Sequence, residues 1–393
     1  MSSVNVSEDA SPANINLKQL KEAIPAECFQ SSATTSLLYL ARDIIYAAAL
    51  VYTALQIDSI PSPWLQAVAW LAYTFAQGCV GTGLWILAHE CGHGAFSPYK
   101  GLNDFVGWVV HSFLLVPYFS WQITHARHHR YTGNIARDVV FVPPTETELK
   151  EGNHRLSKLL EHAEDTPLVT LARLVQFQLI GWQVYLVSNA TAGKKSLPDT
   201  DNATTSSTTA NHFTLTSRLF SPSQRWSVLL TDIGLLLTFG FLYFVSTRVG
   251  VKTTLLLYLV PYLWVHHWLV AITYLHHTHP DIPYHTEETW TFTKGAMGTV
   301  DRSCMGFIGR HFFHEIVDYH AVHHLFPKIP FYHAERATHA ITPLMGDRYM
   351  EAKNESFLGS LYSTFKSCNY VAERRDEKNQ AGTGQLFWVL KRE

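Results

Sequence analysis

Three short clusters of histidine stand out in the 393-residue sequence. The first is a pair with three residues between its members, and the other two repeat the pattern His-x-x-His-His. The clusters consist of His89 and His93, of His125, His128 and His129, and of His320, His323 and His324. Residues three or four positions apart share one face of a helix, so each cluster can direct two or three imidazoles at one place.

Eight imidazoles in this spacing predict a metal site. Imidazole is a good ligand for iron, copper, nickel and zinc, and eight nitrogens exceed what one ion can hold. We therefore expect two metal ions where the clusters meet.

The first cluster also fits a different chemistry. His89, Glu90 and His93 form the pattern His-Glu-x-x-His, in which a zinc protease uses the histidines as ligands and the glutamate as general base. An intramembrane zinc metalloprotease is therefore an alternative function. It needs only one zinc and leaves the other two clusters unexplained, whereas in a two-metal oxidase Glu90 would only orient a ligand imidazole.

The clusters lie beside long segments without charge. The chain is 47% hydrophobic and only 16% charged, and its charge-free runs are about as long as a membrane-spanning helix, which needs about 20 residues. These runs predict an integral membrane protein. The near balance of 30 basic and 32 acidic residues gives no reason to expect a nucleic-acid partner.

All three clusters can meet only if they lie on one side of the membrane, and this decides which runs cross it. Phe105 to Ala126, broken by Pro117, and Leu174 to Gly193 should then lie at the interface. The expected spans are Ile44 to Ile57, Ser59 to Ala88, Trp226 to Thr247 and Thr253 to Leu275. The predicted fold is all-α, with four transmembrane helices in two hairpins, interfacial helices and a cytosolic helical cap that carries the histidines.

The same topology divides the chain into three parts. We expect a cytosolic N-terminal segment at 1–41, a membrane domain with its cytosolic cap at 42–346 and a cytosolic tail at 347–393. The polar stretch Ser196 to Asn211 reads as a loop. Only Arg248 and Lys252 carry positive charge in the two short outer turns, so the positive-inside rule places the clusters in the cytosol.

The clusters and their flanks resemble the membrane-bound fatty acid desaturases, most closely the microsomal oleate delta-12 (omega-6) class. The matching strings are HECGH, with its flank GAFS, LVPYFSWQ before the second cluster, HARHHR, TGNIARDVVFVPP, ITYLHHTHPD, TVDRS, and HAVHHLFPKIPFYHAE at the third cluster. The resemblance is tight over 85–144 and 269–346 and rests on hydropathy elsewhere.

The resemblance implies two irons held by the cluster histidines, with a ninth ligand after the last span. His277 matches that ligand best, with His276 and His279 as its alternatives. It also implies dioxygen, an acyl chain in a membrane lipid as substrate, the endoplasmic reticulum membrane, and electrons from a separate cytochrome b5 and its reductase. The expected reaction introduces a cis double bond at carbon 12 of an oleoyl chain.

Two positions depart from the usual pattern of this class. Gly94 follows the first cluster where a bulkier His or Gln is usual, and Tyr319 precedes the third where a small residue such as Thr is commoner. Relatives that hydroxylate, epoxidise, conjugate, form triple bonds or act as omega-3 desaturases differ at few residues near these clusters. These reactions therefore remain alternative functions.

Other polar residues near the clusters are candidates to support the ligands. They are His111, His266, His267, His311, His314, Glu315 and Asp318. Four further histidines are expected on the surface or in loops, namely His154, His162, His212 and His339.

Overall fold

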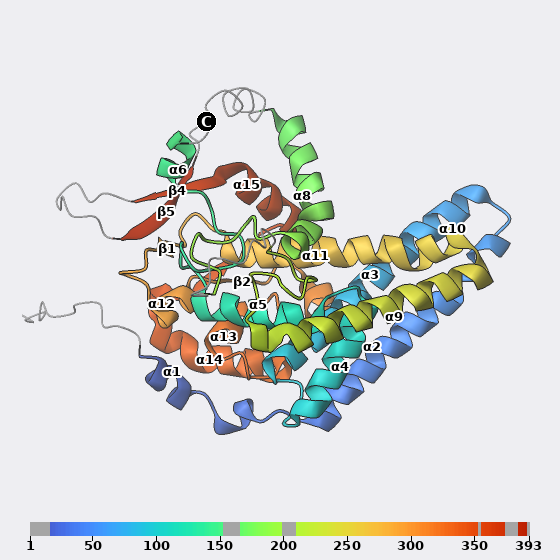
Figure 1. Cartoon of the computed structure of the whole chain (residues 1–393), viewed down its shortest axis with the longest axis horizontal. Coiled ribbons are helices and arrows are strands. Elements are labelled where there is room, and N and C mark those ends of the chain that lie inside the picture. Colours follow the sequence, from blue (N-terminus) through green and yellow to red (C-terminus); the bar gives the residue numbers. More distant parts are fainter. Residues whose placement is uncertain (1–15, 152–165, 199–209, 353–354, 374–383, 391–393) are drawn as a thin grey trace, which may run out of the picture.

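The computed structural model describes residues 16–151, 166–198, 210–352, 355–373 and 384–390. Figure 1 shows long helices that extend from a more compact cap, and helix dominates the described residues. The helices are α1 (Leu17–Ala23), α2 (Ala33–Ala54), α3 (Pro63–His93), α4 (Lys100–Phe113), α5 (Tyr118–Tyr131), α6 (Glu146–Glu151), α8 (Pro167–Val187), α9 (Arg225–Val249), α10 (Val251–Thr254), α11 (Val260–His277), α12 (Phe292–Met297), α13 (His320–Leu325), α14 (Ala334–Met345) and α15 (Phe357–Ser367).

Four helical segments within the described residues are long and apolar enough to cross a membrane, as the sequence predicts. They are Ala33–Ser59, Pro63–His93, Pro222–Val249 and Val251–His277. They form two hairpins whose turns lie together at the end farthest from the cap (Figure 1). The hydroxyl of Tyr73 on α3 donates to the carbonyl of Leu257, 2.9 Å away, and so joins the two hairpins near these turns. The predicted membrane fold is confirmed.

The first span is longer than its apolar run, because it begins at Ala33 and not at Ile44. Ser32 caps the helix by accepting a hydrogen bond from the amide of Thr35 at 3.2 Å. Arg42 and Asp43 therefore lie inside the helix, where Arg42 Nε donates to Asp43 at 2.9 Å. His314 Nε2 lies 2.8 Å from the other oxygen of Asp43. Both charged residues therefore have partners inside the folded structure.

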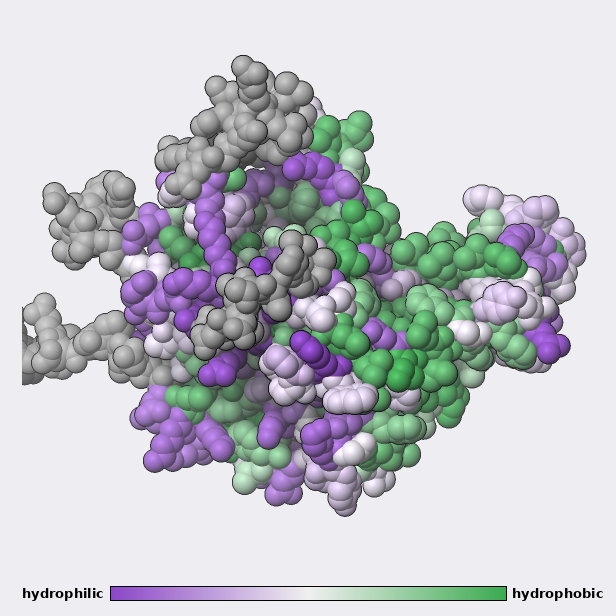
Figure 2. All heavy atoms as spheres, in the orientation of Figure 1, coloured by the Kyte–Doolittle hydropathy of each residue, from purple (hydrophilic) through white to green (hydrophobic). Residues whose placement is uncertain are grey.

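Neither of the two segments predicted to lie at the interface is among the candidate spans of the described residues. The run from Phe105 to Ala126 is split into α4 and α5, with Pro117 just before α5 and a positive φ of 51° at Leu115. Helix α8 runs across the direction of α9 and α11 in Figure 1. Its outer side exposes Leu168, Leu171 and Val187, and Figure 2 shows apolar surface around it. Such an apolar outer side suits a helix that lies on the membrane surface.

The cap contains short strands that the all-α prediction missed. They are β1 (Tyr284–His285), β2 (Val300–Arg302), β3 (Met350–Ala352), β4 (Cys368–Glu373) and β5 (Gln385–Leu390). One sheet has the order β1-β5-β4 with antiparallel pairs, and β2 pairs with β3 in parallel. These strands hold the segments that follow α11 and α15 against the cap. Of the predicted loop Ser196–Asn211, residues 199–209 lie outside the described residues.

The contact between α3 and α11 depends on a glycine. A Cβ added to Gly78 would lie closer to Trp264 Cβ than real carbon atoms approach, and Gly81 has a similar neighbour in Val265. We expect Gly78→Val to lower the free energy of unfolding by about 1–3 kcal/mol through overpacking. Thermal unfolding in detergent, monitored by size-exclusion chromatography, measures the change in melting temperature. Gly240→Val is the matched control, because nothing lies within 4 Å of a Cβ at that exposed position in α9. Equal melting temperatures for the two variants would contradict the packing argument.

Candidate metal centre

The three clusters lie on three helices that end or begin in the cap. His89 and His93 occupy the last turn of α3, which Gly94 closes with a left-handed φ of 72°. The second cluster lies on α5, and the third supplies three of the six residues of the short helix α13. Gly94 therefore has a local role, since a side chain there would strain the turn that ends the first cluster.

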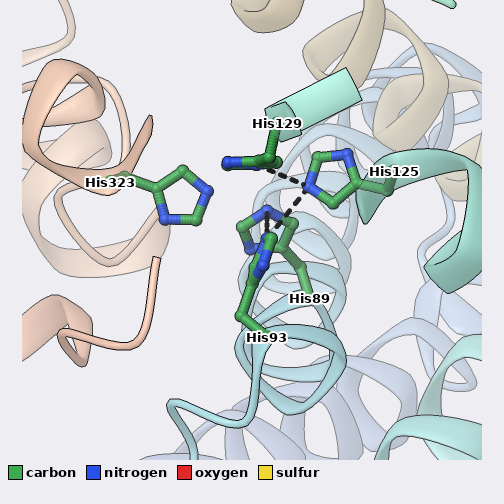
Figure 3. A group of neighbouring side chains, drawn as sticks. All are labelled: His89, His93, His125, His129 and His323. Atoms are coloured by element: carbon green, nitrogen blue, oxygen red, sulfur yellow. Dashed lines mark hydrogen bonds between the residues drawn. The ribbon is translucent and has the colours of Figure 1, made fainter. Parts of the chain in front are cut away.

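Five histidines form a first group, consisting of His89, His93, His125, His129 and His323. Figure 3 shows their rings pointing toward a common centre from three helices. The Nε2 atom of His93 is 3.2 Å from that of His89 and 3.1 Å from that of His125. The Nε2 atoms of His125 and His129 are 3.1 Å apart. His93 and His125 are half-buried and the other three are buried.

The remaining four histidines lie beside the first group; three of them form a second group, and His320 adjoins it. His128 Nε2 lies 3.2 Å from His277 Nε2, and His320 Nε2 lies 3.2 Å from His324 Nε2. His128, His277 and His324 are all buried and close enough to share one ion. The rings of His129 and His324 stack at a centroid distance of 4.1 Å, which places the two groups side by side.

The donor atoms suit two metal ions. Nitrogen ligands bound about 2.1 Å from one ion and at right angles to one another lie about 3 Å apart, which is close to the observed spacing. Burial is the larger cause, and the neighbouring imidazoles the smaller one, that lowers the pKa of His125, His129 and His324 well below the usual value for histidine. The same causes lower the pKa of His320 and His323. Neutral rings keep the lone pair that a metal requires.

The three histidines considered for the ninth ligand have different surroundings. His277 points its Nε2 at His128, inside the second group. His276 instead directs Nδ1 at the carbonyl of Val300, 2.6 Å away, and stacks on His320. His279 is near Asp281, with 3.7 Å between Nδ1 and Oδ2. The structure thus brings His277 together with the eight cluster histidines and keeps His279 apart.

Two aspartates that the sequence analysis did not single out support the centre. Asp138 Oδ1 lies 2.8 Å from His128 Nδ1 and accepts from the amide of Val139, while Oδ2 accepts from the amide of Gly133. A carboxylate on Nδ1 leaves the His128 Nε2 lone pair directed at the second group. The string TGNIARDVV contains this residue, but only the turn after α5 shows that it folds back.

The second aspartate holds the third cluster. Asp301 on β2 accepts from the amide of Ala321 at 2.7 Å and from the hydroxyl of Tyr349 at 2.8 Å. Burial raises the pKa of Asp301 to about 7, although these hydrogen bonds oppose the shift. Asp301 therefore fixes the start of α13 from a different element.

The acidic residues that the sequence did single out have other partners. Glu90 accepts from the amide of Phe331 at 3.0 Å, and its other oxygen is 3.8 Å from His89 Nδ1, too far for a hydrogen bond. Glu90 therefore ties α3 to the segment after α13. Asp318 faces Arg310 at 3.6 Å. Neither Asp318 nor Glu315 has a described hydrogen bond to a cluster histidine.

Aromatic rings pack against the first group. Trp85 stacks on His89 with ring centroids 5.5 Å apart, and Trp121 stacks on His125 at 4.5 Å. His111 lies between these two indoles and directs Nε2 at the carbonyl of Trp85, 3.1 Å away. Burial lowers the pKa of His111 to about 3. His111 thus packs against the two indoles that touch His89 and His125.

The remaining histidines have different surroundings. His314 pairs with Asp43 beneath the third cluster, and His311 packs against Phe307. His212 lies in a loop, as predicted, but it is buried there, and Thr124 Oγ1 lies 3.0 Å from its Nε2. His339 is exposed, as expected. His154 and His162 lie outside the described residues. His266 and His267 pair with glutamines of α8.

An apolar cavity of about 330 Å³ opens onto the centre. Its walls come mainly from α8 and α11, with His125 and His128 of α5 at one side. Trp85, Trp121 and Trp182 lie on the cavity wall, and most of the exposed lining is apolar. A long hydrocarbon chain suits such a space, because its binding needs apolar walls and few polar partners.

Comparison with known proteins gives the family of the chain. Residues 62–353 match the family model described as fatty acid desaturase. The chain is 40% identical to an oleate hydroxylase of Claviceps purpurea, covering 96% of this chain and 81% of the relative. It is 40% identical to a delta(12) fatty acid desaturase of Mortierella alpina (92% and 89%) and 39% identical to one of Arabidopsis thaliana (91% and 88%).

The chain belongs to the fatty acid desaturase family. It is accordingly an oxidoreductase of the membrane. The metalloprotease reading is wrong, because the pattern at His89 to His93 is part of a five-histidine group and Glu90 is hydrogen-bonded to a backbone amide.

Removal of the Asp138 carboxylate tests the support of the second group. We expect Asp138→Ala to weaken metal retention about 10–100-fold, since such a partner fixes ligand orientation. The metal content of the purified protein is measured after dialysis against increasing concentrations of a chelator. Asp281→Ala is the control, because Asp281 is exposed and apart from both groups. Equal retention in the two variants would show that Asp138 does not orient a ligand.

Proposed function

We propose that the chain is an acyl-lipid desaturase that introduces a cis double bond at carbon 12 of an oleoyl chain. The observation that carries this proposal is the apolar cavity whose wall includes His125 and His128, one from each histidine group. The names of the relatives add the position of the double bond, since several are delta(12) desaturases.

Two irons are the proposed cofactors. His89, His93, His125, His129 and His323 would hold one, and His128, His277, His320 and His324 the other. Bound iron would supply the activation of dioxygen that removal of hydrogen from an unactivated methylene requires. The close Nε2 spacing and the low pKa values of the cap histidines support this assignment.

The residues of the chain itself would bind the acyl chain, orient the histidine rings and exclude water. Trp85 and Trp121 keep the His89 and His125 rings in place and keep water from their apolar side. The walls of the cavity hold one stretch of the acyl chain beside the ligands, and this positioning selects the carbons that react. Asp138 and Asp301 keep two of the ligand-bearing segments rigid.

Electrons would come from a separate cytochrome b5 and its reductase at the cytosolic face of the endoplasmic reticulum. Support comes from the charge distribution, since the outer turns carry only Arg248 and Lys252 as basic residues. Helix α1 and strands β4 and β5 lie at the cap end in Figure 1, so both ends of the described chain are on the side of the histidines.

A hydroxylase is the second candidate function. The oleate hydroxylase of Claviceps purpurea is as similar to this chain as the desaturase of Mortierella alpina, at 40% identity. The two reactions would use the same metals and the same cavity. They differ only in what happens to the carbon after the first hydrogen has left.

Expression in a yeast without polyunsaturated fatty acids, followed by lipid analysis, tests the proposal. We expect linoleate in the lipids, whereas ricinoleate would support the hydroxylase. We expect His323→Ala to abolish product because it removes a ligand of the first group. His339→Ala, at an exposed site on α14, is the matched control and should keep full activity. An unchanged lipid profile with well-expressed protein would contradict both functions.

A further inference from the structure

Helix α8 supplies a large share of the cavity wall, including Phe177, Gly181 and Tyr185. It packs against α11, which supplies Leu269, Val270 and Thr273 to the same wall. The distance between these two helices therefore sets the width of the space beside His125 and His128.

Two polar pairs fix α8 on α11. His267 Nδ1 lies 3.1 Å from Gln178 Oε1. His266 Nδ1 lies 2.5 Å from the side-chain amide of Gln183, whose oxygen accepts when the amide is oriented to satisfy both of its ends. Such pairs in apolar surroundings are costly to break, because each partner would be left unsatisfied. They determine the register of α8 and explain the adjacent histidines in a membrane span.

Gly181 lies between these two pairs, within the helical turns that face α11. A glycine inside a helix is about 1 kcal/mol less favourable than alanine, so we expect a structural requirement at this position. It is not among the glycines with positive φ, so backbone conformation does not require it. Close packing does not require it either, because an added Cβ would be 3.5 Å from Phe177 and 3.6 Å from Val270.

The remaining reason is space in the cavity, since Gly181 is part of its wall. We propose that Gly181 determines which acyl chains the cavity admits, because any side chain larger than a methyl group at this position would occupy the space that the chain needs. This inference rests on the proposed function. It identifies a residue outside the histidine clusters that sets the chain length accepted by the site.

Substitutions of increasing size at position 181 test this inference in the same yeast. Such cells make both oleoyl chains and palmitoleoyl chains, which are shorter by two methylenes. We expect Gly181→Ala to behave like wild type and Gly181→Val and Gly181→Leu to lower oleoyl conversion progressively. For leucine we expect a loss of about tenfold or more, because one methylene in an apolar pocket already changes selectivity by about that factor. Palmitoleoyl conversion should fall less, so the ratio of the two products should change.

Gly240→Leu is the matched control, because it places the same side chain on an exposed helical glycine with nothing within 4 Å. Iron content and elution volume should be equal for all these proteins. A Gly181→Leu protein with wild-type conversion, or one that loses both substrates equally, would overturn the inference. The graded Ala and Val variants decide the matter if the leucine variant does not fold. If wild type makes no product at all, the proposed function fails instead.

Discussion

The crowding of nine imidazoles into one space is the constraint on which the rest of the structure depends. Ring nitrogens 3.1–3.2 Å apart can share at most one proton per pair, and several are removed from water. A buried polar group without a partner costs about 1–3 kcal/mol, so this arrangement is unfavourable unless metal ions occupy it. The fold has to impose it.

Rigid elements from distant parts of the chain impose it. The first cluster ends the candidate span α3, the second lies on the shorter helix α5, and the third begins a short helix held by Asp301. The pair of Asp43 and His314 ties the first span to the segment before the third cluster. Because the spans supply these anchors, the membrane domain and the metal centre are parts of one structure, and damage to the helix packing should also damage the site.

The sequence predicted those parts of the fold that depend on short-range patterns. Helical spacing identified eight histidines, and the requirement that they meet selected the four segments that are long and apolar enough to span a membrane. Partners distant in sequence were not predictable. Asp43 lies inside the first span with His314 beside it, and His212 lies against Thr124 where the segment after α8 returns to α5. The role of Asp138 depends on a turn that no periodicity reveals.

The number of iron atoms per chain tests the central claim most directly. Protein purified in mild detergent from iron-replete cells is analysed by inductively coupled plasma mass spectrometry, alongside an accurate protein concentration. A group of five histidines and a group of three, with His320 beside the second, predict two irons per chain. One iron per chain, or one zinc without iron, in folded and active protein would contradict the account.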